Sequence, residues 1–150
     1  MNQTRAIKVL LIDDEANFRD ATIKLLLRRG FECVGAGNAR EGINLIGKEK
    51  FDVVVLDVKM PGMSGNEAIK EIRKIAADLP VIMLTGHGTP DSVVSGLQDG
   101  VFDYLSKPCS IDVLASRLGD AVQHRRPLAQ VERRVADIMI PLSDYSTIHA

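Results

Sequence analysis

The chain has 150 residues, of which 45% are hydrophobic and 26% charged, and its formal net charge is -1. This is the balance of a soluble globular domain with a tail, and it gives no general attraction to nucleic acid or to anionic membranes. No window approaches the ~20 apolar residues of a membrane span, so we expect a cytoplasmic protein whose Cys33 and Cys109 form neither a zinc site nor a disulfide.

Short apolar runs recur along the chain and predict strands. The third run, Val53–Leu56, contains three β-branched residues and leads directly into Asp57, which favours a strand that is buried on both faces. The five predicted strands are, in chain order, Ile7–Ile12, Glu32–Ala36, Val53–Leu56, Val81–Leu84 and Tyr104–Ser106.

Longer segments with helical spacing separate these runs, because their apolar residues recur at intervals of three or four. Ser64 with Glu67, and Asn38 with Glu41, predict capping boxes at the start of two of them. The five predicted helices carry the apolar sets Ile23, Leu26 and Leu27; Ile43 and Ile46; Ile69, Ile72 and Ile75; Val93, Val94 and Leu97; and Val113, Leu114 and Leu118, the last beginning at Ser110 and running toward Gln123.

Strands that alternate with helices predict an α/β fold. Parallel neighbours need a crossover connection, which is nearly always right-handed, so the expected architecture is a doubly wound sheet with helices on both faces. In such sheets ligands gather outside the carboxyl ends of the strands. The residues at those ends are therefore the candidates for function.

Polar residues occupy the strand ends, and they predict a metal site beside a phosphate site. The first strand ends in Asp13 and Asp14, the third in Asp57, the fourth in Thr85 and the fifth in Lys107. Three carboxylates in one crevice would repel one another unless a cation neutralises them, and carboxylates with a backbone carbonyl and waters suit Mg²⁺. Lys107 would then supply a positive charge, and the Thr85 hydroxyl a hydrogen-bond donor, to the oxygens of a phosphate.

Four segments, "LLIDDE", "VVVLDVKMPGMSG", "VIMLTGHG" and "FDYLSKP", resemble in order the signature segments of two-component response regulator receiver domains, which are CheY-like. The resemblance covers residues from about Ile7 to about Gln123. It implies a flavodoxin-like five-stranded sheet in the order 2-1-3-4-5 with five helices. It also implies that a sensor histidine kinase, a phosphotransfer protein or a small acyl phosphate donates a phosphoryl group to an aspartate.

By position, the resemblance makes Asp57 the phosphate acceptor. Asp14 would bind Mg²⁺ directly, Asp13 would help through water, and Asp57 and the backbone carbonyl of Lys59 would complete the protein ligands. Lys107 would hold the phosphoryl oxygens. The implied chemistry is in-line positioning with charge neutralisation, because a carboxylate is a weak nucleophile.

The resemblance also implies a switch. Thr85 would move toward the phosphate while Tyr104 turns inward, and Lys107 and Pro108 would be joined by a cis peptide. The surface of the fourth helix, fifth strand and fifth helix would carry the change and could support a homodimer. Such a protein is not an enzyme in the usual sense, since it catalyses only its own phosphoryl transfer and dephosphorylation.

Two other aspartate or phosphate chemistries fit the residues less well. A haloacid-dehalogenase-type phosphatase needs a second aspartate two residues after the first, where this chain has Lys59. A flavodoxin-like carrier of flavin mononucleotide needs a Ser/Thr/Gly-rich loop after the first strand, where this chain has two acids. The alternative that stays open is a pseudo-receiver, a docking module that binds its partner regardless of phosphate.

The composition changes after the predicted receiver domain, which spans residues 1–124. Residues 125–150 contain four arginines, and "VADIMIPLSDYSTI" resembles the opening of cystathionine-β-synthase-type (CBS) modules. We therefore expect a basic linker followed by the truncated start of a CBS or other output domain. Neither a recognition helix nor a Walker motif is present, so no direct binding of nucleic acid is expected from this chain.

Overall fold

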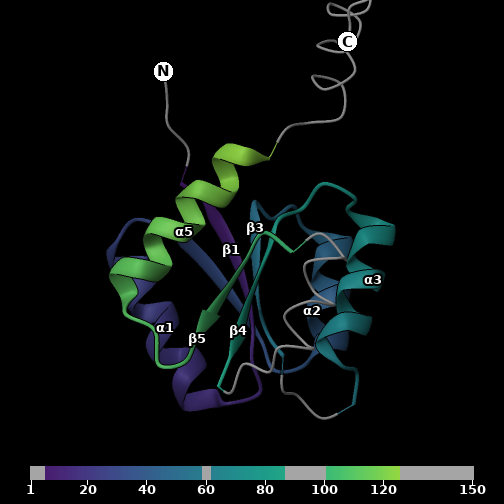
Figure 1. Ribbon diagram of the computed structural model, residues 1–150, viewed down its shortest axis with the longest axis horizontal. Coiled ribbons are helices and arrows are strands. Elements are labelled where there is room, and N and C mark those ends of the chain that lie inside the picture. Colours follow the sequence, from purple (N-terminus) through teal and green to yellow (C-terminus); the bar gives the residue numbers. More distant parts are fainter. Residues whose placement is uncertain (1–5, 59–61, 87–100, 126–150) are drawn as a thin grey trace, which may run out of the picture.

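The structure is a computed structural model that describes residues 6–58, 62–86 and 101–125. In this part of the chain five parallel strands form one sheet with helices on both faces (Figure 1). This arrangement confirms the predicted flavodoxin-like sheet, whose order reverses between its first and third strands. The strands are β1 (Lys8–Ile12), β2 (Glu32–Ala36), β3 (Val53–Asp57), β4 (Val81–Thr85) and β5 (Asp103–Ser106), in the order β2-β1-β3-β4-β5.

Four helices are described. On one face of the sheet lie α1 (Ala16–Arg28) and α5 (Ile111–His124), and on the other lie α2 (Ala39–Lys48) and α3 (Gly65–Ile75) (Figure 1). The fourth predicted helix falls within residues 87–100, which are outside the described residues. None of the helices in the described ranges combines the length and the apolar character that crossing a bilayer requires.

The strand boundaries differ by one residue from the predicted ones in four places. β1 begins at Lys8 and β5 at Asp103, while β3 and β4 each extend one residue further, to Asp57 and Thr85. The extensions arise because these two polar residues still pair with the neighbouring strand: Asp57 is in register with Leu84, and Thr85 with Ser106. Two candidate site residues therefore belong to the rigid sheet and not to loops.

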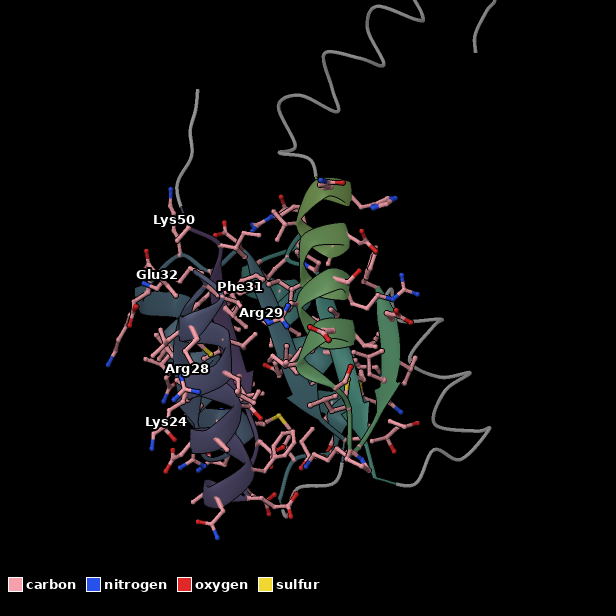
Figure 2. All side chains as sticks on the ribbon, turned by 90° about the vertical axis from the view of Figure 1, so that its left-hand side faces the viewer. Lys24, Arg28, Arg29, Phe31, Glu32 and Lys50 are labelled. Atoms are coloured by element: carbon pink, nitrogen blue, oxygen red, sulfur yellow. The ribbon has the colours of Figure 1, made fainter. Side chains whose placement is uncertain are left out.

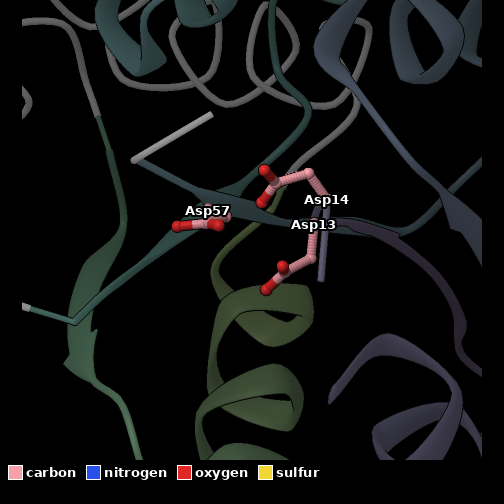
Figure 3. A group of neighbouring side chains, drawn as sticks. All are labelled: Asp13, Asp14 and Asp57. Carbon is pink, nitrogen blue, oxygen red and sulfur yellow. The ribbon is translucent and has the colours of Figure 1, made fainter. Parts of the chain in front are cut away.

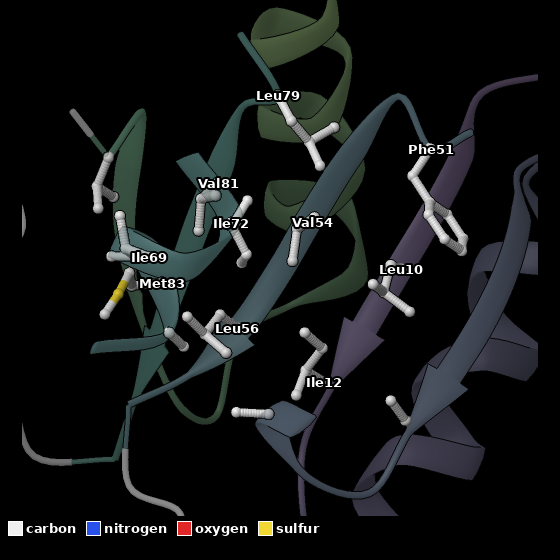
Figure 4. Close-up of a cluster of buried hydrophobic side chains, with 14 residues drawn as sticks. Leu10, Ile12, Phe51, Val54, Leu56, Ile69, Ile72, Leu79, Val81 and Met83 are labelled. Carbon is white, nitrogen blue, oxygen red and sulfur yellow. The ribbon is translucent and has the colours of Figure 1, made fainter. Parts of the chain in front are cut away.

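Alternation along the strands divides the core into two layers. Val9 and Leu11 of β1 pack with the layer under α1 and α5, whereas Leu10 and Ile12 pack with the layer under α2 and α3 (Figure 4). Two of the three interior strands, β3 and β4, are buried at every position. A fully buried Val, Leu or Ile side chain contributes roughly 1.5–3 kcal/mol to stability, so this core holds the carboxyl ends of β1, β3 and β4 firmly together.

One of the two predicted capping boxes is complete and the other is only half formed. Ser64 Oγ accepts from the Glu67 N–H at 3.1 Å, and the Glu67 carboxylate accepts from the Ser64 N–H at 3.0 Å. Asn38 likewise accepts from the Glu41 N–H, but the Glu41 carboxylate accepts from the Gly37 N–H instead of that of Asn38. The two N-cap residues also differ in backbone conformation, with φ -159° at Asn38 and -71° at Ser64.

Basic side chains gather at the end of α1. Figure 2 shows Lys24, Arg28 and Arg29 along its last turns, with Lys50 beyond them. Gly30 follows with φ 90°, a left-handed conformation that suits glycine after a helix C-terminus. Because β2 starts directly afterwards, this basic region lies at the amino end of the strands, away from the polar carboxyl ends.

Cys33, in β2, provides a test of the packing between β2 and α1. Burial raises the pKa of the Cys33 thiol from 9.0 to about 12, and only the thiolate reacts quickly with disulfide reagents. We therefore expect Ellman's reagent at mildly alkaline pH to modify native Cys33 at least ~10-fold more slowly than Cys33 of the unfolded chain. Peptide mass spectrometry would follow both cysteines in native and urea-unfolded protein, and equal Cys33 rates in the two states would contradict this packing.

Candidate functional site

Three carboxylates converge where β1 and β3 end. Asp13 and Asp14 directly follow β1, and Asp57 is the last residue of β3. One oxygen of each lies within 4.8 Å of the others, and Figure 3 shows the three side chains grouped at the ends of their strands. Asp13 is 0% and Asp57 3% exposed, while Asp14 is open to solvent. Two buried acids and one exposed acid thus share one small space, as the pattern of strand ends predicted.

Lys107 reaches this cluster from the loop after β5. Its Nζ lies 2.7 Å from Asp13 Oδ2, 2.6 Å from Glu15 Oε1 and 3.6 Å from Asp57 Oδ2. Burial alone would lower the pKa of Lys107, but the contacts with Asp13 and Glu15 and the charge of Asp57 outweigh it and hold that pKa above its usual value. The amine is therefore a permanent positive charge beside Asp57, and the peptide bond between Lys107 and Pro108 is cis as predicted.

Two residues of α1 belong to the surroundings of this amine although the sequence patterns did not single them out. Glu15, at the N-cap of α1, contributes the carboxylate 2.6 Å from Lys107 Nζ. Phe18, one turn further, places its ring centroid 4.4 Å from the same Nζ, a cation–π arrangement. Their three-residue spacing indicates that they share one face of the helix, but no sequence pattern indicated that this face meets Lys107.

The backbone around Asp13 is fixed from two sides. The Glu15 N–H donates to Asp13 Oδ1 at 2.9 Å, and Arg19 donates to the Asp13 carbonyl oxygen at 2.7 Å. Asp13 N–H in turn donates to the Ala36 carbonyl at the end of β2. These bonds orient the Asp13 carboxylate toward Asp57 and Lys107 before any ligand arrives.

Thr85 and Tyr104 lie on the same face of the sheet. Tyr104 is in register with Met83, and Thr85 follows Met83 by two residues on β4. Because side chains two residues apart share a face, Thr85 and Tyr104 are diagonal neighbours. Thr85 is buried, and Tyr104 packs against the core layer that contains Met83. Both residues therefore belong to the face of the sheet that α2 and α3 cover.

Lys59 is the predicted site residue that falls outside the described residues, so its carbonyl is not placed. The structure brings Asp13, Asp14, Asp57, Thr85 and Lys107 to the carboxyl edge of the sheet, whereas Tyr104 lies two residues before the end of β5. Beside them lies a hollow of about 270 Å³, which is lined by Asp14, Glu15, Asp57, Gly86 and Lys107.

The donor set at this hollow fits a hard divalent cation. The oxygens of Asp13, Asp14 and Asp57 are close enough to share one ion, and carboxylates are the ligands that Mg²⁺ prefers. Asp13 Oδ2 is buried and, within the described residues, accepts no hydrogen bond of regular geometry, although it forms the ion pair with Lys107. Asp13, Asp14 and Asp57 are therefore the side chains that would hold such a cation, and the Lys107 ammonium beside them would attract an anion.

Known proteins are similar to this chain in sequence and in fold. The family model for the response regulator receiver domain matches residues 9–119. Transcriptional regulatory protein GlrR of Escherichia coli (strain K12) is 34% identical over 128 residues, which are 85% of this chain and 29% of GlrR. Phosphate regulon transcriptional regulatory protein PhoB of Pseudomonas aeruginosa is 35% identical over 121 residues, 79% of this chain and 53% of PhoB. The chain thus spans only part of the length of these curated relatives.

Solved structures agree with the sequence matches. A response regulator receiver domain protein from Clostridium thermocellum superposes with a TM-score of 0.74 at 35% identity, covering 78% of this chain and 94% of that one. A CheY-like receiver domain protein from Methanospirillum hungatei JF-1 gives a TM-score of 0.76 at 28% identity, covering 79% and 95%. The similarity therefore extends over nearly the whole of both solved domains.

Proposed function

The chain belongs to the response regulator receiver domain family, and on that basis we propose that it accepts a phosphoryl group on Asp57 from a sensor histidine kinase or a phosphotransfer protein. The observation that carries this proposal is the convergence of Asp13, Asp14 and Asp57 around Lys107. The reaction would run in the cytoplasm, where the expected kinase domains meet their partners. The chain would act as a switch and would catalyse only its own phosphorylation and dephosphorylation.

In this proposal each residue of the cluster has one task. Asp14, Asp13, Asp57 and the Lys59 carbonyl would hold Mg²⁺, which when bound neutralises the charge on the transferring phosphoryl group. An Asp57 oxygen attacks phosphorus, and the bond between phosphorus and the donor breaks. Lys107 lies 3.6 Å from Asp57 Oδ2, where its ammonium can bind an oxygen of the group as it arrives.

Phosphorylation would be communicated through Thr85 and Tyr104. Their position on one face of adjacent strands supports this, because Thr85 can reach toward new charge at Asp57 and leave space for the Tyr104 ring. The surface that would carry the change includes β5 and α5, together with the fourth predicted helix in residues 87–100. We propose the same surface for a homodimer, and an output domain or partner would read it.

The chain beyond the receiver domain would connect it to its output. Arg125, the last described residue, is held against the domain: its guanidinium is 3.1 Å from Asp78 Oδ1 and donates to the Phe51 carbonyl at 2.8 Å. The basic linker and the CBS-like segment proposed for residues 125–150 otherwise lie outside the described residues. The ion pair thus holds the last described residue of the chain against the domain.

Magnesium should stabilise the folded protein if the three carboxylates bind it. At a hundredfold excess over its Kd, Mg²⁺ should add about 2.7 kcal/mol to the free energy of unfolding, which scanning calorimetry with and without EDTA would measure. Asp14→Asn should lose most of this gain, and without metal it should be at least as stable as the wild type because one of three mutually repelling charges is gone.

Asp20→Asn is the matched control, since Asp20 is an exposed acid further along α1. This variant should respond to Mg²⁺ as the wild type does. An undiminished Mg²⁺ response in Asp14→Asn would speak against the metal site. A normal Mg²⁺ response without any labelling by acetyl phosphate would instead favour the pseudo-receiver.

A further inference from the structure

The Lys107 ammonium is closer to Glu15 than to the proposed phosphate acceptor. Its Nζ lies 2.6 Å from Glu15 Oε1 and 3.6 Å from Asp57 Oδ2. Lys107 is only 13% exposed at its side chain, whereas the Glu15 side chain is 64% exposed. Glu15 therefore lies at the boundary between the buried cluster and the solvent. Its Oε1 contacts the Lys107 amine, and most of its side chain is exposed.

Glu15 also adds a negative charge at the entrance. It lines the same hollow as Asp14, Asp57 and Lys107, so a phosphoryl donor that occupies this hollow lies beside the Glu15 carboxylate. Mg²⁺ would offset charges among Asp13, Asp14 and Asp57, which converge on one point. Glu15 is not in that set, and within the described ranges its charge is paired with Lys107 alone. The Glu15 carboxylate consequently repels a negatively charged donor.

We propose that Glu15 determines donor specificity by disfavouring small phosphoryl donors in proportion to their negative charge. This inference rests on the proposed phosphorylation of Asp57 and describes the regulation of the same site. A free acyl phosphate is repelled by the Glu15 carboxylate. It must also displace that carboxylate from the Lys107 ammonium. A protein donor can place a cationic or hydrogen-bonding group of its own against the exposed face of Glu15, which removes both penalties.

Two small phosphoryl donors differ in net charge but give the same product, and can therefore be compared. Acetyl phosphate is a dianion at neutral pH: Asp57 oxygen bonds to phosphorus, the phosphorus–oxygen bond breaks, and acetate leaves with the electron pair. Phosphoramidate is a monoanion whose nitrogen is already protonated: the phosphorus–nitrogen bond breaks, and neutral ammonia leaves with the electron pair. Both reactions give the same aspartyl phosphate, so their relative rates report how the site treats the charge of the donor.

The test measures labelling rates of the full chain with both donors at saturating Mg²⁺, by intact-protein mass spectrometry. In Glu15→Gln we expect the ratio of the acetyl phosphate rate to the phosphoramidate rate to rise about threefold, the size of effect typical of one exposed charge. Added salt should bring the wild-type ratio toward that of the variant, because screening weakens the repulsion. A contribution to folding alone would alter both rates together and leave the ratio unchanged.

Matched variants decide between charge and contact. Glu15→Asp keeps the charge on a shorter side chain and should keep the wild-type ratio, as should Asp20→Asn, which removes an exposed acid elsewhere on α1. An equal acceleration of both donors in Glu15→Gln would overturn the inference, as would a rise of the ratio in Asp20→Asn. If neither donor labelled the wild type, the proposed function itself would fail, which is a separate and recognisable outcome.

Discussion

Asp57→Asn is expected to abolish labelling of the protein by acetyl phosphate in the presence of Mg²⁺. The amide has nearly the shape of the carboxylate but lacks its nucleophilic oxygen, and Asp57 is 3% exposed at the end of a central strand. Losing the nucleophile of a covalent transfer costs at least ~1000-fold in rate. Intact-protein mass spectrometry over a time course would measure the phosphoryl group that each chain carries.

The fold should survive this change, because the substitution removes one of three clustered negative charges. Circular dichroism would check this point. Asp20→Asn provides the comparison for loss of an acid from a surface position and should be labelled as the wild type is. Labelling of Asp57→Asn at unchanged stoichiometry would refute the choice of acceptor and direct attention to another carboxylate.

Lys107→Met should reduce the labelling rate by about 100-fold while leaving Asp57 intact. A charge that is already aimed at the site where negative charge develops is worth about 100- to 1000-fold in rate, and Lys107 is held 3.6 Å from Asp57 Oδ2. Methionine keeps much of the apolar stem that packs near Phe18. Single-turnover labelling at saturating Mg²⁺ would separate this effect from weaker metal binding.

The loss of Lys107 also leaves the buried Asp13 carboxylate without its ion-pair partner. Breaking a buried pair by removing one member costs about 3–5 kcal/mol, so thermal unfolding of the variant should be followed together with labelling. Lys74→Met is the matched control, since Lys74 pairs only with Glu71 on the exposed face of α3 among the described residues. Labelling of a folded Lys107→Met variant at the wild-type rate would contradict the role of the amine.

The sequence was sufficient to predict the layers of the fold because burial imposes a strong pattern. Val53–Leu56 and Val81–Leu84 are apolar throughout, and both lie in the two strands that are buried at every position. The boundaries were less predictable, because pairing with a neighbouring strand extends β3 to Asp57 and β4 to Thr85. Polarity alone cannot show that a buried aspartate still pairs with the neighbouring strand.

The candidate site was likewise predictable only in part from the sequence. Residues that end parallel strands meet at one edge for topological reasons, so Asp13, Asp14, Asp57 and Lys107 could be grouped before their distances were known. Glu15 and Phe18 could not, since their contacts with Lys107 depend on how the start of α1 packs against the loop after β5. A long lysine side chain can reach several partners, and only the packing decides which carboxylate it touches first.

The central claim is that Asp57, a divalent cation and Lys107 together form one phosphoryl-binding site. Titration with beryllofluoride, a mimic of a phosphoryl group on a carboxylate, followed by fluorine NMR tests it most directly. We expect one equivalent to bind per chain with Mg²⁺ present, none after EDTA, and none in Asp57→Asn. Binding that persists without the metal or without the Asp57 carboxylate would contradict the account.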